Sequence, residues 1–232
     1  MADISEPAKV RLLHLMRLLE KHAQAGDGGP VTSARIEHLT GWSRETIRKD
    51  ISCLERAPGF DGSAGEPFDG PARGGSAGYR PELLIPLIKK GLGLDRRRKF
   101  CVVGLGRLGS ACLNFPPPEL AEFELAAGFD SNVNRVEILR SAAPLYPAYK
   151  MAEVISRFGI EIALLCVPAG SAQAAADKCA EAGIRGILNY APVALNLQPE
   201  IAVRNVFVTD DLRSLAVKIK EKPAEAAFHV LL

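Results

Sequence analysis

The chain has 232 residues, 47% of them hydrophobic and 24% charged, with a formal net charge of +2. These values are typical of globular proteins and exclude a disordered or fibrous chain. The near balance of charge predicts no bulk attraction to nucleic acid or membrane, so any DNA binding depends on where basic side chains gather. Five cysteines without a CxxC pair favour neither a disulfide framework nor a zinc finger. The apolar runs are too short for a membrane-spanning helix, which favours a soluble, cytoplasmic protein.

Helical periodicity dominates the first part of the chain. From residue 7 to residue 25, apolar side chains recur at three- and four-residue spacing, which predicts an amphipathic helix. Ser33 and Ser43 stand where caps start two further helices, and Gly41 between them is typical of a turn. Pro81 suits the first turn of a fourth helix. The predicted helices are 7–25, 33–39, 43–54 and 81–90.

Two breaks in composition divide the chain. The stretch 61–78 is rich in glycine and contains two prolines, which predicts an extended loop. The charged segment 95–99, DRRRK, directly precedes an apolar run, and we place a domain boundary there. Beyond it, strands alternate with helices, the order that builds a parallel sheet covered by helices. The predicted strands are 100–103, 124–129, 162–167, 186–188 and 203–208, and the predicted helices are 108–113, 151–158, 171–182 and 211–221.

A glycine-rich turn follows the first predicted strand. Gly104, Gly106 and Gly109 form a GxGxxG pattern that opens a helix. In dinucleotide-binding folds, the first glycine allows a tight turn, the second lets the backbone approach a pyrophosphate, and the third packs helix against strand. Asp130, at the end of the next strand and about 20 positions after the last glycine, suits a ribose hydroxyl and repels a 2′-phosphate. The pattern predicts an NAD(H) site that also includes Leu105, Arg107 and Leu108 in the loop, with Val167 and Pro168 at a neighbouring strand end.

The segment 33–54 has the order of a helix-turn-helix, whose second helix enters a DNA major groove. If Ile47, Ile51 and Leu54 face the core, the basic side chains of the second helix are left on its outer surface. The loop that follows has the position of a wing, and Arg73 within it is placed to enter a minor groove. An ordinary helical bundle is the alternative, because acidic residues stand among the basic ones. The candidate DNA-binding residues are Ser43, Arg44, Thr46, Arg48, Lys49 and Arg73.

Taken together, these segments resemble the Rex family of redox-sensing transcriptional repressors, in which a winged helix is followed by a Rossmann domain. The resemblance covers about residues 8–220. Besides the glycine loop and Phe129-Asp130, it depends on the segments IRKDIS at 47–52, GLGLD at 91–95, GILNYAPV at 186–193 and VRNV at 203–206.

The resemblance implies a homodimer that binds a pseudo-palindromic operator with NAD⁺ or without ligand, releases it on binding NADH, and represses genes for NADH-reoxidising metabolism. The C-terminal helix would insert between the two domains of the partner subunit. The glycine loop and Asp130 would hold the adenosine half of the cofactor, and Ala191 and Pro192 would lie near the nicotinamide. The implied domains are a winged helix at 1–94, a Rossmann domain at 95–209, and a dimerisation helix with its tail at 210–232.

Three features depart from the family's pattern. Phe115 stands where the family usually has a tyrosine in an NYP segment, and Phe207 stands where it usually has an aspartate in an NVD segment. In the family, that tyrosine and aspartate form a polar switch with an arginine that matches Arg17. Phenylalanine can neither accept a proton nor pair with an arginine, so we expect a weaker response to NADH. The third departure is an expanded wing, 57–77, which contains three acidic residues.

The sequence leaves two alternatives open. One is an NAD-dependent oxidoreductase with a helical accessory domain, although all four histidines lie outside the region of alternating strands and helices and no proton donor is apparent. The other is a Rex-like protein that has lost NADH sensing and binds DNA constitutively or binds another nucleotide. Our interpretation is an α/β protein, with a winged helix, a parallel Rossmann-type sheet and an exchanged C-terminal helix, that represses transcription, is not an enzyme and holds no metal.

Overall fold

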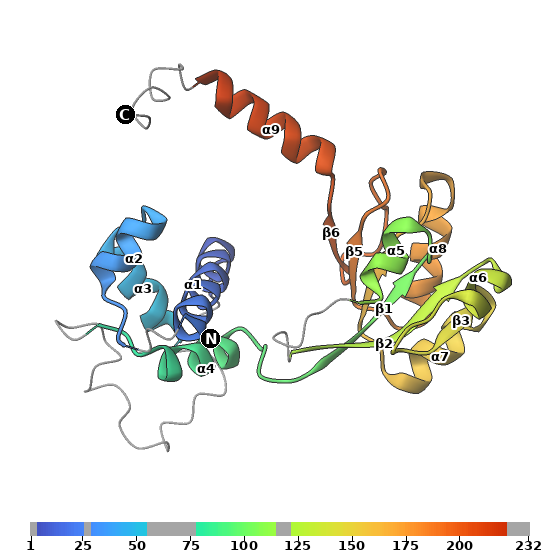
Figure 1. The fold of residues 1–232 in the computed structure, drawn as a ribbon, viewed down its shortest axis with the longest axis horizontal. Helices are drawn as coiled ribbons and strands as arrows, with labels where there is room; N and C mark the ends of the chain where they lie inside the picture. Colours follow the sequence, from blue (N-terminus) through green and yellow to red (C-terminus); the bar gives the residue numbers. More distant parts are fainter. Residues whose placement is uncertain (1–3, 26–28, 55–77, 115–121, 222–232) are drawn as a thin grey trace. The chain divides into compact units, whose positions relative to one another are not determined.

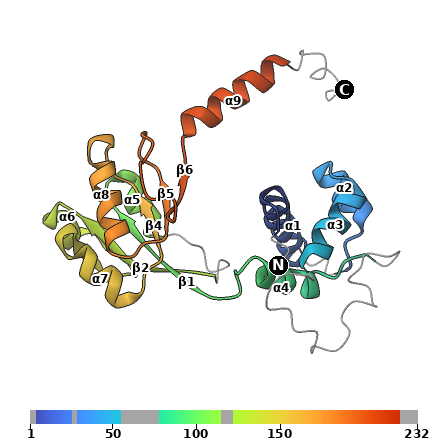
Figure 2. The ribbon, with the colours of Figure 1, turned by 180° about the vertical axis from the view of Figure 1, so that it is seen from behind.

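The computed structural model describes residues 4–25, 29–54, 78–114 and 122–221. The chain divides into two compact units, residues 1–96 and 97–232 (Figures 1 and 2). The predicted wing, 57–77, with Arg73, and the residue Phe115 lie outside the described residues. No helix in the described part of the chain is long and apolar enough to cross a membrane.

The described part of the first unit contains four helices, whose bounds agree with the sequence prediction to within one residue. Amphipathic spacing explains the agreement, because a buried helix face repeats every three or four residues. An antiparallel bridge between Val31 and Tyr79 joins the chain before α2 to the chain before α4. The helices are α1 (Glu6–Gln24), α2 (Ser33–Thr40), α3 (Arg44–Leu54) and α4 (Pro81–Gly91). Their core contains Leu12, Leu15 and Leu19 of α1, Ile36 of α2, Ile47, Ile51 and Leu54 of α3, and Leu84, Leu87 and Ile88 of α4.

The ends of α2 define the turn into α3. Gly41 ends α2 with φ at +73°, a left-handed conformation that favours glycine. The N-terminal cap is Thr32, whose Oγ1 accepts a hydrogen bond from the backbone N–H of Arg35 at 3.2 Å. The prediction that Ser33 caps this helix is wrong, because a cap needs extended backbone angles and Ser33 is already helical and buried.

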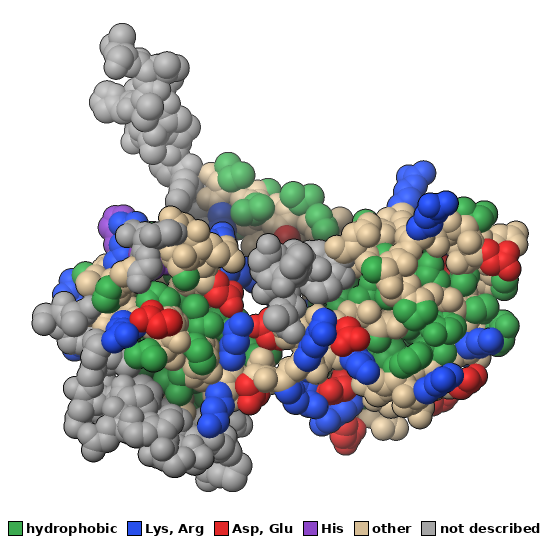
Figure 3. Space-filling model, turned by 60° about the horizontal axis from the view of Figure 1, so that its bottom comes forward, with side chains coloured by type: hydrophobic (Ala, Val, Ile, Leu, Met, Phe, Trp, Pro, Cys, Tyr) green, Lys and Arg blue, Asp and Glu red, His purple; other side chains and the backbone are tan. Residues whose placement is uncertain are grey.

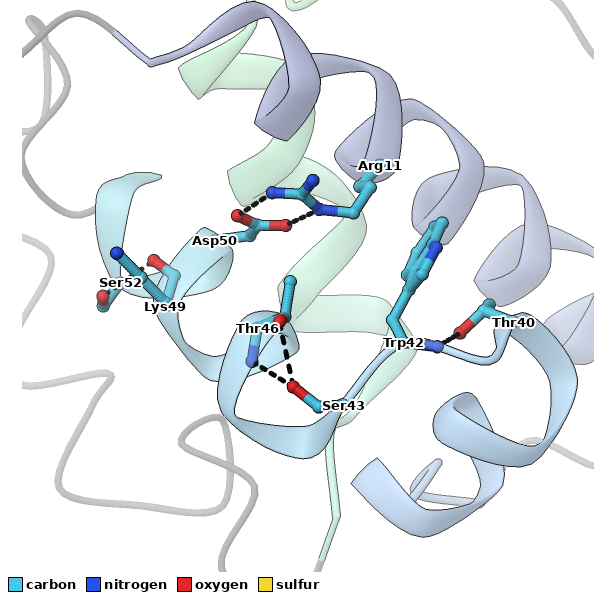
Figure 4. Close-up of polar contacts among 8 residues, drawn as sticks. All are labelled: Arg11, Thr40, Trp42, Ser43, Thr46, Lys49, Asp50 and Ser52. Atoms are coloured by element: carbon cyan, nitrogen blue, oxygen red, sulfur yellow. Dashed lines mark hydrogen bonds and ion pairs between the residues drawn. The ribbon is translucent and has the colours of Figure 1, made fainter.

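A buried ion pair joins α1 to α3 (Figure 4). Arg11 donates two hydrogen bonds to the carboxylate of Asp50, from Nε at 2.6 Å and from Nη2 at 2.8 Å. The Asp50 side chain is only 9% exposed, so its charge is largely withdrawn from solvent and compensated by the guanidinium. The hydrogen bond to Asp50 raises the pKa of Arg11 above its ordinary value. Asp50 therefore holds two helices together and does not contribute an acidic group to the outer surface of α3.

The second unit contains a six-stranded parallel sheet in the order β3-β2-β1-β4-β5-β6. The parallel α/β class predicted from the alternation of strands and helices is confirmed. The strand order reverses between β1 and β4, and in such sheets ligands bind outside the carboxyl ends of the strands at this point. The strands are β1 (Arg98–Val103), β2 (Phe123–Asp130), β3 (Leu145–Pro147), β4 (Ile162–Leu165), β5 (Gly186–Asn189) and β6 (Ala202–Asn205).

Apolar side chains cover both faces of this sheet, as a parallel sheet requires. Alternate residues of β1 point to opposite faces. Cys101 and Val103 pack with residues of α7 and α8, whereas Phe100 and Val102 pack with Leu105 and with residues at the end of α5. The helices are α5 (Arg107–Cys112), α6 (Val133–Ile138), α7 (Met151–Phe158) and α8 (Ala169–Glu181), with a short 3-10 helix η2 (Ala148–Lys150).

One strand and one α-helix of the second unit escape the sequence pattern, and two predicted strands are too long, of which 162–167 ends at Leu165. β3 has three half-buried residues and α6 has six residues, none of them buried, so neither shows an apolar period. The predicted strand 203–208 ends at Asn205. Phe207 already belongs to the next helix start, because its carbonyl accepts hydrogen bonds from the N–H groups of Asp210 and Asp211.

The last described helix, α9 (Val208–Glu221), follows β6 after two residues and begins three residues before the predicted start (Figure 1). Every side chain from Val208 to Lys220 is exposed, including the apolar Leu212, Leu215 and Ile219. An apolar stripe of this kind needs a surface to cover it. Among the described residues, the sheet of the same chain does not provide one.

Candidate functional site

The glycine loop lies between β1 and α5, where the strand order reverses. Gly104 has φ at +89°, and a Cβ atom there would lie 2.7 Å from the carbonyl oxygen of Cys166, which follows β4. A Cβ atom on Gly109 would overlap the carbonyl oxygen of Gly104. The packing of the loop itself therefore requires these two glycines, with or without a ligand.

Gly106 differs from the other two glycines. Apart from its chain neighbours, a Cβ atom at this position would meet no atom within 4 Å. Its φ of −67° is open to any residue. The packing of the protein does not explain a glycine here, but a bare backbone leaves room for a ligand to come close, which is the role of the second glycine in dinucleotide sites.

Asp130 ends β2 and anchors the glycine loop. Its Oδ2 accepts hydrogen bonds from the backbone N–H of Leu105 at 2.6 Å and from Nη1 of Arg135 at 3.1 Å. Its Oδ1 accepts a hydrogen bond from the N–H of Asn132 at 2.7 Å. Burial raises the pKa of this carboxyl, but the hydrogen bonds from Asn132, Leu105 and Arg135 outweigh it and hold the pKa below its ordinary value. Because a carboxylate offers about four acceptor positions, one remains for a ligand beside these three bonds.

A cavity of about 690 Å³ opens beside the glycine loop, at the carboxyl ends of β1, β2 and β4. Clefts of this size at strand ends are typical small-molecule sites of α/β proteins. The cavity brings together six of the residues predicted to bind a cofactor, Gly104, Gly106, Leu108, Asp130, Val167 and Pro168.

The other predicted cofactor residues do not line this cavity in the described part of the chain. Leu105 is buried and gives its N–H to the carboxylate at the end of β2, and Gly109 packs against the first glycine. Arg107 and Pro192 are exposed, and Ala191 is buried in the loop after β5. Leu105 and Gly109 therefore shape the cavity without facing it.

Two cationic residues of the cavity wall were missed by the sequence prediction. Arg135 comes from α6 and reaches Asp130, and Lys178 comes from the last turn of α8. Two cations in the wall of the cavity that Gly106 also lines suit an anionic ligand. The sequence signal for Arg135 is its place five positions after Asp130, on a helix that shows no apolar period.

Two further ionisable groups of the wall are uncharged at neutral pH. Burial raises the pKa of the Cys166 thiol to about 12, and its interactions with Cys112 add to this effect. Burial also raises the pKa of Tyr190. The wall beside β4 and β5 is therefore neutral, unlike the wall beside Arg135.

On the first unit, three of the predicted DNA-binding residues already have partners, and two of them, Ser43 and Thr46, are drawn in Figure 4. Ser43 caps α3, because its Oγ accepts a hydrogen bond from the backbone N–H of Thr46 at 3.2 Å. The hydroxyl of Thr46 also lies 2.9 Å from this Oγ. Arg44 is paired with Glu37 of α2 at 2.8 Å. A DNA contact by Arg44 therefore requires an exchange of partners.

The outer face of α3 carries Arg48 and Lys49. Both are exposed, and neither has an ion pair with another described residue. Burial of Ile47 and Ile51 confirms the predicted inner face of this helix. On the face of the molecule drawn in Figure 3, basic and acidic side chains are interspersed.

Comparison with known proteins places the chain in a family. Residues 95–193 match the family model described as a CoA binding domain. A redox-sensing transcriptional repressor Rex of Limosilactobacillus reuteri is 32% identical over 190 residues, which are 82% of each chain. A Rex of Limosilactobacillus fermentum is 30% identical over 209 residues, which are 90% of this chain and 87% of that one. The chain belongs to the Rex family.

Solved structures of RSP, a Rex-family repressor, share this fold. RSP is 26% identical, with a TM-score of 0.75 over 95% of this chain and 96% of that one. Two further RSP structures, one with β-NAD⁺ and operator DNA and one with β-NADH, each give a TM-score of 0.76. Rex proteins are transcriptional repressors, not enzymes, so the family sets aside the oxidoreductase alternative.

The positions where this Rex chain departs from the family's polar switch are described in part. Phe207 is half-buried between β6 and α9, and Arg17 is exposed on α1 without an ion pair to another described residue. Phe115 lies outside the described residues. The side chain at 207 has no oxygen that can hold a guanidinium.

Proposed function

We propose that this Rex chain is an NAD(H)-responsive repressor that binds the dinucleotide in the glycine-loop cavity and operator DNA through α3, as a homodimer. Gly106 carries the proposal. The packing of the loop requires Gly104 and Gly109, but Gly106 faces a cavity and open space, so the close approach of a ligand is the remaining reason for a glycine there. The structures of RSP with β-NAD⁺ and with β-NADH support this class of ligand.

The residues of the cavity fit a dinucleotide. The backbone of Gly106, with Arg135 and Lys178, suits a pyrophosphate. The uncharged wall at Cys166 and Tyr190 suits the nicotinamide ring. When bound, the nicotinamide supplies a ring that is cationic in NAD⁺ and neutral in NADH, and this difference is the redox signal.

Asp130 favours NAD(H) over NADP(H). Its remaining acceptor position suits a ribose hydroxyl, and its negative charge opposes a 2′-phosphate. Arg135 partly offsets that charge, because its guanidinium is paired with the carboxylate and is 43% exposed. The selectivity therefore depends on the Asp130–Arg135 pair and not on the carboxylate alone.

Operator contacts are assigned first to Arg48 and Lys49, which are exposed and unpaired among the described residues. Cations of this kind contribute phosphate contacts, and the first turn of a recognition helix reaches base edges. Ser43, Arg44 and Thr46 belong to that first turn, and Arg73 belongs to the wing. The structure of RSP with operator DNA supports DNA as the partner of this unit.

We assign the contact between the two copies of the homodimer to α9. Its apolar Leu212, Leu215 and Ile219 are exposed in the single chain and need a partner surface. Exchange of α9 into a second copy would cover them and would link the cofactor units of the dimer to its DNA-binding units.

One observation favours a second candidate, a Rex-type DNA-binding protein that does not respond to NADH. Phe207, at the root of α9, cannot form the polar switch of the family. A ligand shifts an equilibrium only by its differential affinity for the two states. Without the switch, that difference has to come from the charge and shape of the nicotinamide alone.

A gel-shift titration separates these candidates. An operator is first selected from random-sequence DNA by the protein itself, and its binding is then measured without nucleotide, with NAD⁺ and with NADH. Release by NADH supports the proposed function, whereas unchanged binding by a chain that binds NADH in calorimetry supports the second candidate. A chain that selects no DNA sequence would contradict both.

A further inference from the structure

The side chain of Asn189, at the end of β5, is completely buried and makes three hydrogen bonds. Its Nδ2 donates to the carbonyl oxygen of Val193 at 2.8 Å and to Oδ1 of Asn205 at 2.9 Å. Its Oδ1 accepts a hydrogen bond from the backbone N–H of Ala191 at 3.0 Å. One amide therefore holds both a loop and a neighbouring strand.

The loop that Asn189 holds is part of the cavity wall. Tyr190, the next residue, lines the cavity, and Ala191 follows it. Because Nδ2 and Oδ1 of Asn189 bind Val193 and Ala191, the loop 190–193 is fixed at two points. A displacement of this loop by a ligand has to move or break these bonds.

The strand that Asn189 holds leads directly into α9. Asn205 is its register partner in β6, and the N–H of Val206 donates to the Asn189 carbonyl oxygen at 2.9 Å. Two residues beyond Asn205, the carbonyl oxygen of Phe207 accepts the hydrogen bonds that open α9. The cavity wall and the first turn of α9 are thus joined through the side chain of Asn189 and through the backbone hydrogen bond at its carbonyl oxygen.

We propose that Asn189 is a positioning residue that couples the cofactor cavity to the root of α9. Leaving a hydrogen bond of a buried amide unmade costs free energy. When the loop 190–193 shifts, the Asn189 side chain therefore moves with it and displaces Asn205. The dinucleotide itself is not in contact with Asn205 in this scheme. The inference depends on the proposed function, because it assigns to α9 the response to the nucleotide.

Asn205 offers a sharper test than Asn189. Asn189 is completely buried, so its replacement endangers folding, whereas Asn205 is exposed. Asn205→Ala removes the acceptor on β6 and leaves both bonds from Asn189 to the loop. Asn205→Asp keeps an oxygen acceptor at the same place and is the matched control.

The experiment measures backbone hydrogen exchange of the full chain with and without saturating NADH. In the parent and in Asn205→Asp, NADH should change protection both in the loop 190–193 and in the first turn of α9. In Asn205→Ala, the loop should respond as in the parent, while the response of α9 should fall about threefold or more. A purely structural role would lower stability without separating the two responses.

The proposed coupling is overturned if α9 responds equally in the parent and in Asn205→Ala, or if the parent's loop responds and its α9 does not. Calorimetry on the same samples distinguishes a failure of the coupling from a failure of the proposed function. NADH affinity of Asn205→Ala should stay within about twofold of the parent, because the cavity wall is unchanged. Absence of NADH binding by the parent would contradict the proposed function and the coupling together.

Discussion

The glycine loop and the outer face of α3 hold their candidate residues in opposite ways. In the loop, Asp130 already accepts three hydrogen bonds, and two glycines are packed against the backbone. On α3, Arg48 and Lys49 are exposed without an ion pair among the described residues. A small ligand gains affinity from a site that is already fixed in the geometry it needs. DNA carries phosphates at many positions, so exposed cations without a fixed partner can bind it. A single substitution in the loop should therefore lower ligand affinity strongly, whereas each substitution on α3 should lower operator affinity by a smaller amount.

Gly106→Val should have the largest effect. A Cβ atom at this position meets no atom within 4 Å outside its chain neighbours, so the fold should be kept, but the valine side chain occupies the space in which a ligand approaches the backbone. We expect NADH affinity to fall by about a hundredfold or more, measured by calorimetric titration.

Gly109→Ala is the matched comparison, because its Cβ atom would overlap the carbonyl oxygen of Gly104. It should lower the melting temperature, in contrast to Gly106→Val. NADH affinity unchanged in Gly106→Val would remove this glycine from the site, and an equal loss of stability in both variants would show that Gly106 is also needed for packing.

Arg48→Ala with Lys49→Ala should weaken operator binding and lower its dependence on salt. For every phosphate that these side chains neutralise in each of the two subunits, the slope of log affinity against log salt should become shallower by about 1.8. The control is Arg185→Ala, which removes an exposed cation of the second unit and should leave the slope as it is. An unchanged slope in the double variant would make α3 a packing element only.

Asp130→Asn should narrow the preference for NADH over NADPH by about tenfold, because it removes the charge that opposes a 2′-phosphate while Arg135 remains. The amide oxygen can keep the hydrogen bond from the N–H of Leu105, but the amide nitrogen cannot accept the bond from Asn132, so the variant should also be less stable than the parent. Competition titrations with the two dinucleotides give the ratio directly. If parent and variant prefer NADH equally, selectivity comes from another residue.

The same carboxylate predicts a modest dependence of stability on pH. The pKa of Asp130 is lower in the folded chain than its ordinary value, so its stabilisation is fully present above that ordinary value and is lost as the pH falls through the folded value. The free energy of unfolding, measured by chemical denaturation as the pH falls from 6 to below the pKa of Asp130, should decrease more steeply for the parent than for Asp130→Asn. If the free energy of unfolding depends on pH in the same way for both proteins, the pKa of Asp130 is the same in the folded and the unfolded chain.

Periodicity and glycine spacing predict much of this fold. The four helices of the first unit and the strand, loop and helix around Gly104 follow from apolar spacing of 3.6 or 2 residues and from backbone conformations that favour glycine. α6 and β3 could not be predicted, because short elements with few buried side chains have no period. Arg135, the cation that reaches Asp130, was missed for the same reason.

Long-range pairs are the second gap in the sequence prediction. Arg11 and Asp50 lie 39 positions apart, and no local pattern joins them, so the sequence alone left Asp50 among the acidic groups of the predicted recognition helix. The path from Asn189 to Asn205 is hidden in the same way, because only the pairing of β5 with β6 brings the two amides together. Local sequence patterns predict helices and strands, but the contacts between these elements decide which side chains remain free to bind a ligand or DNA.

The most direct test of this account measures operator affinity at saturating NAD⁺ and at saturating NADH, for the parent and for Phe115→Tyr with Phe207→Asp. The account predicts that NADH weakens operator binding by the parent, and that it does so more strongly in the double variant, where both polar groups of the switch are restored. An NADH effect in the parent as large as in the double variant, or no NADH effect in either, would contradict it.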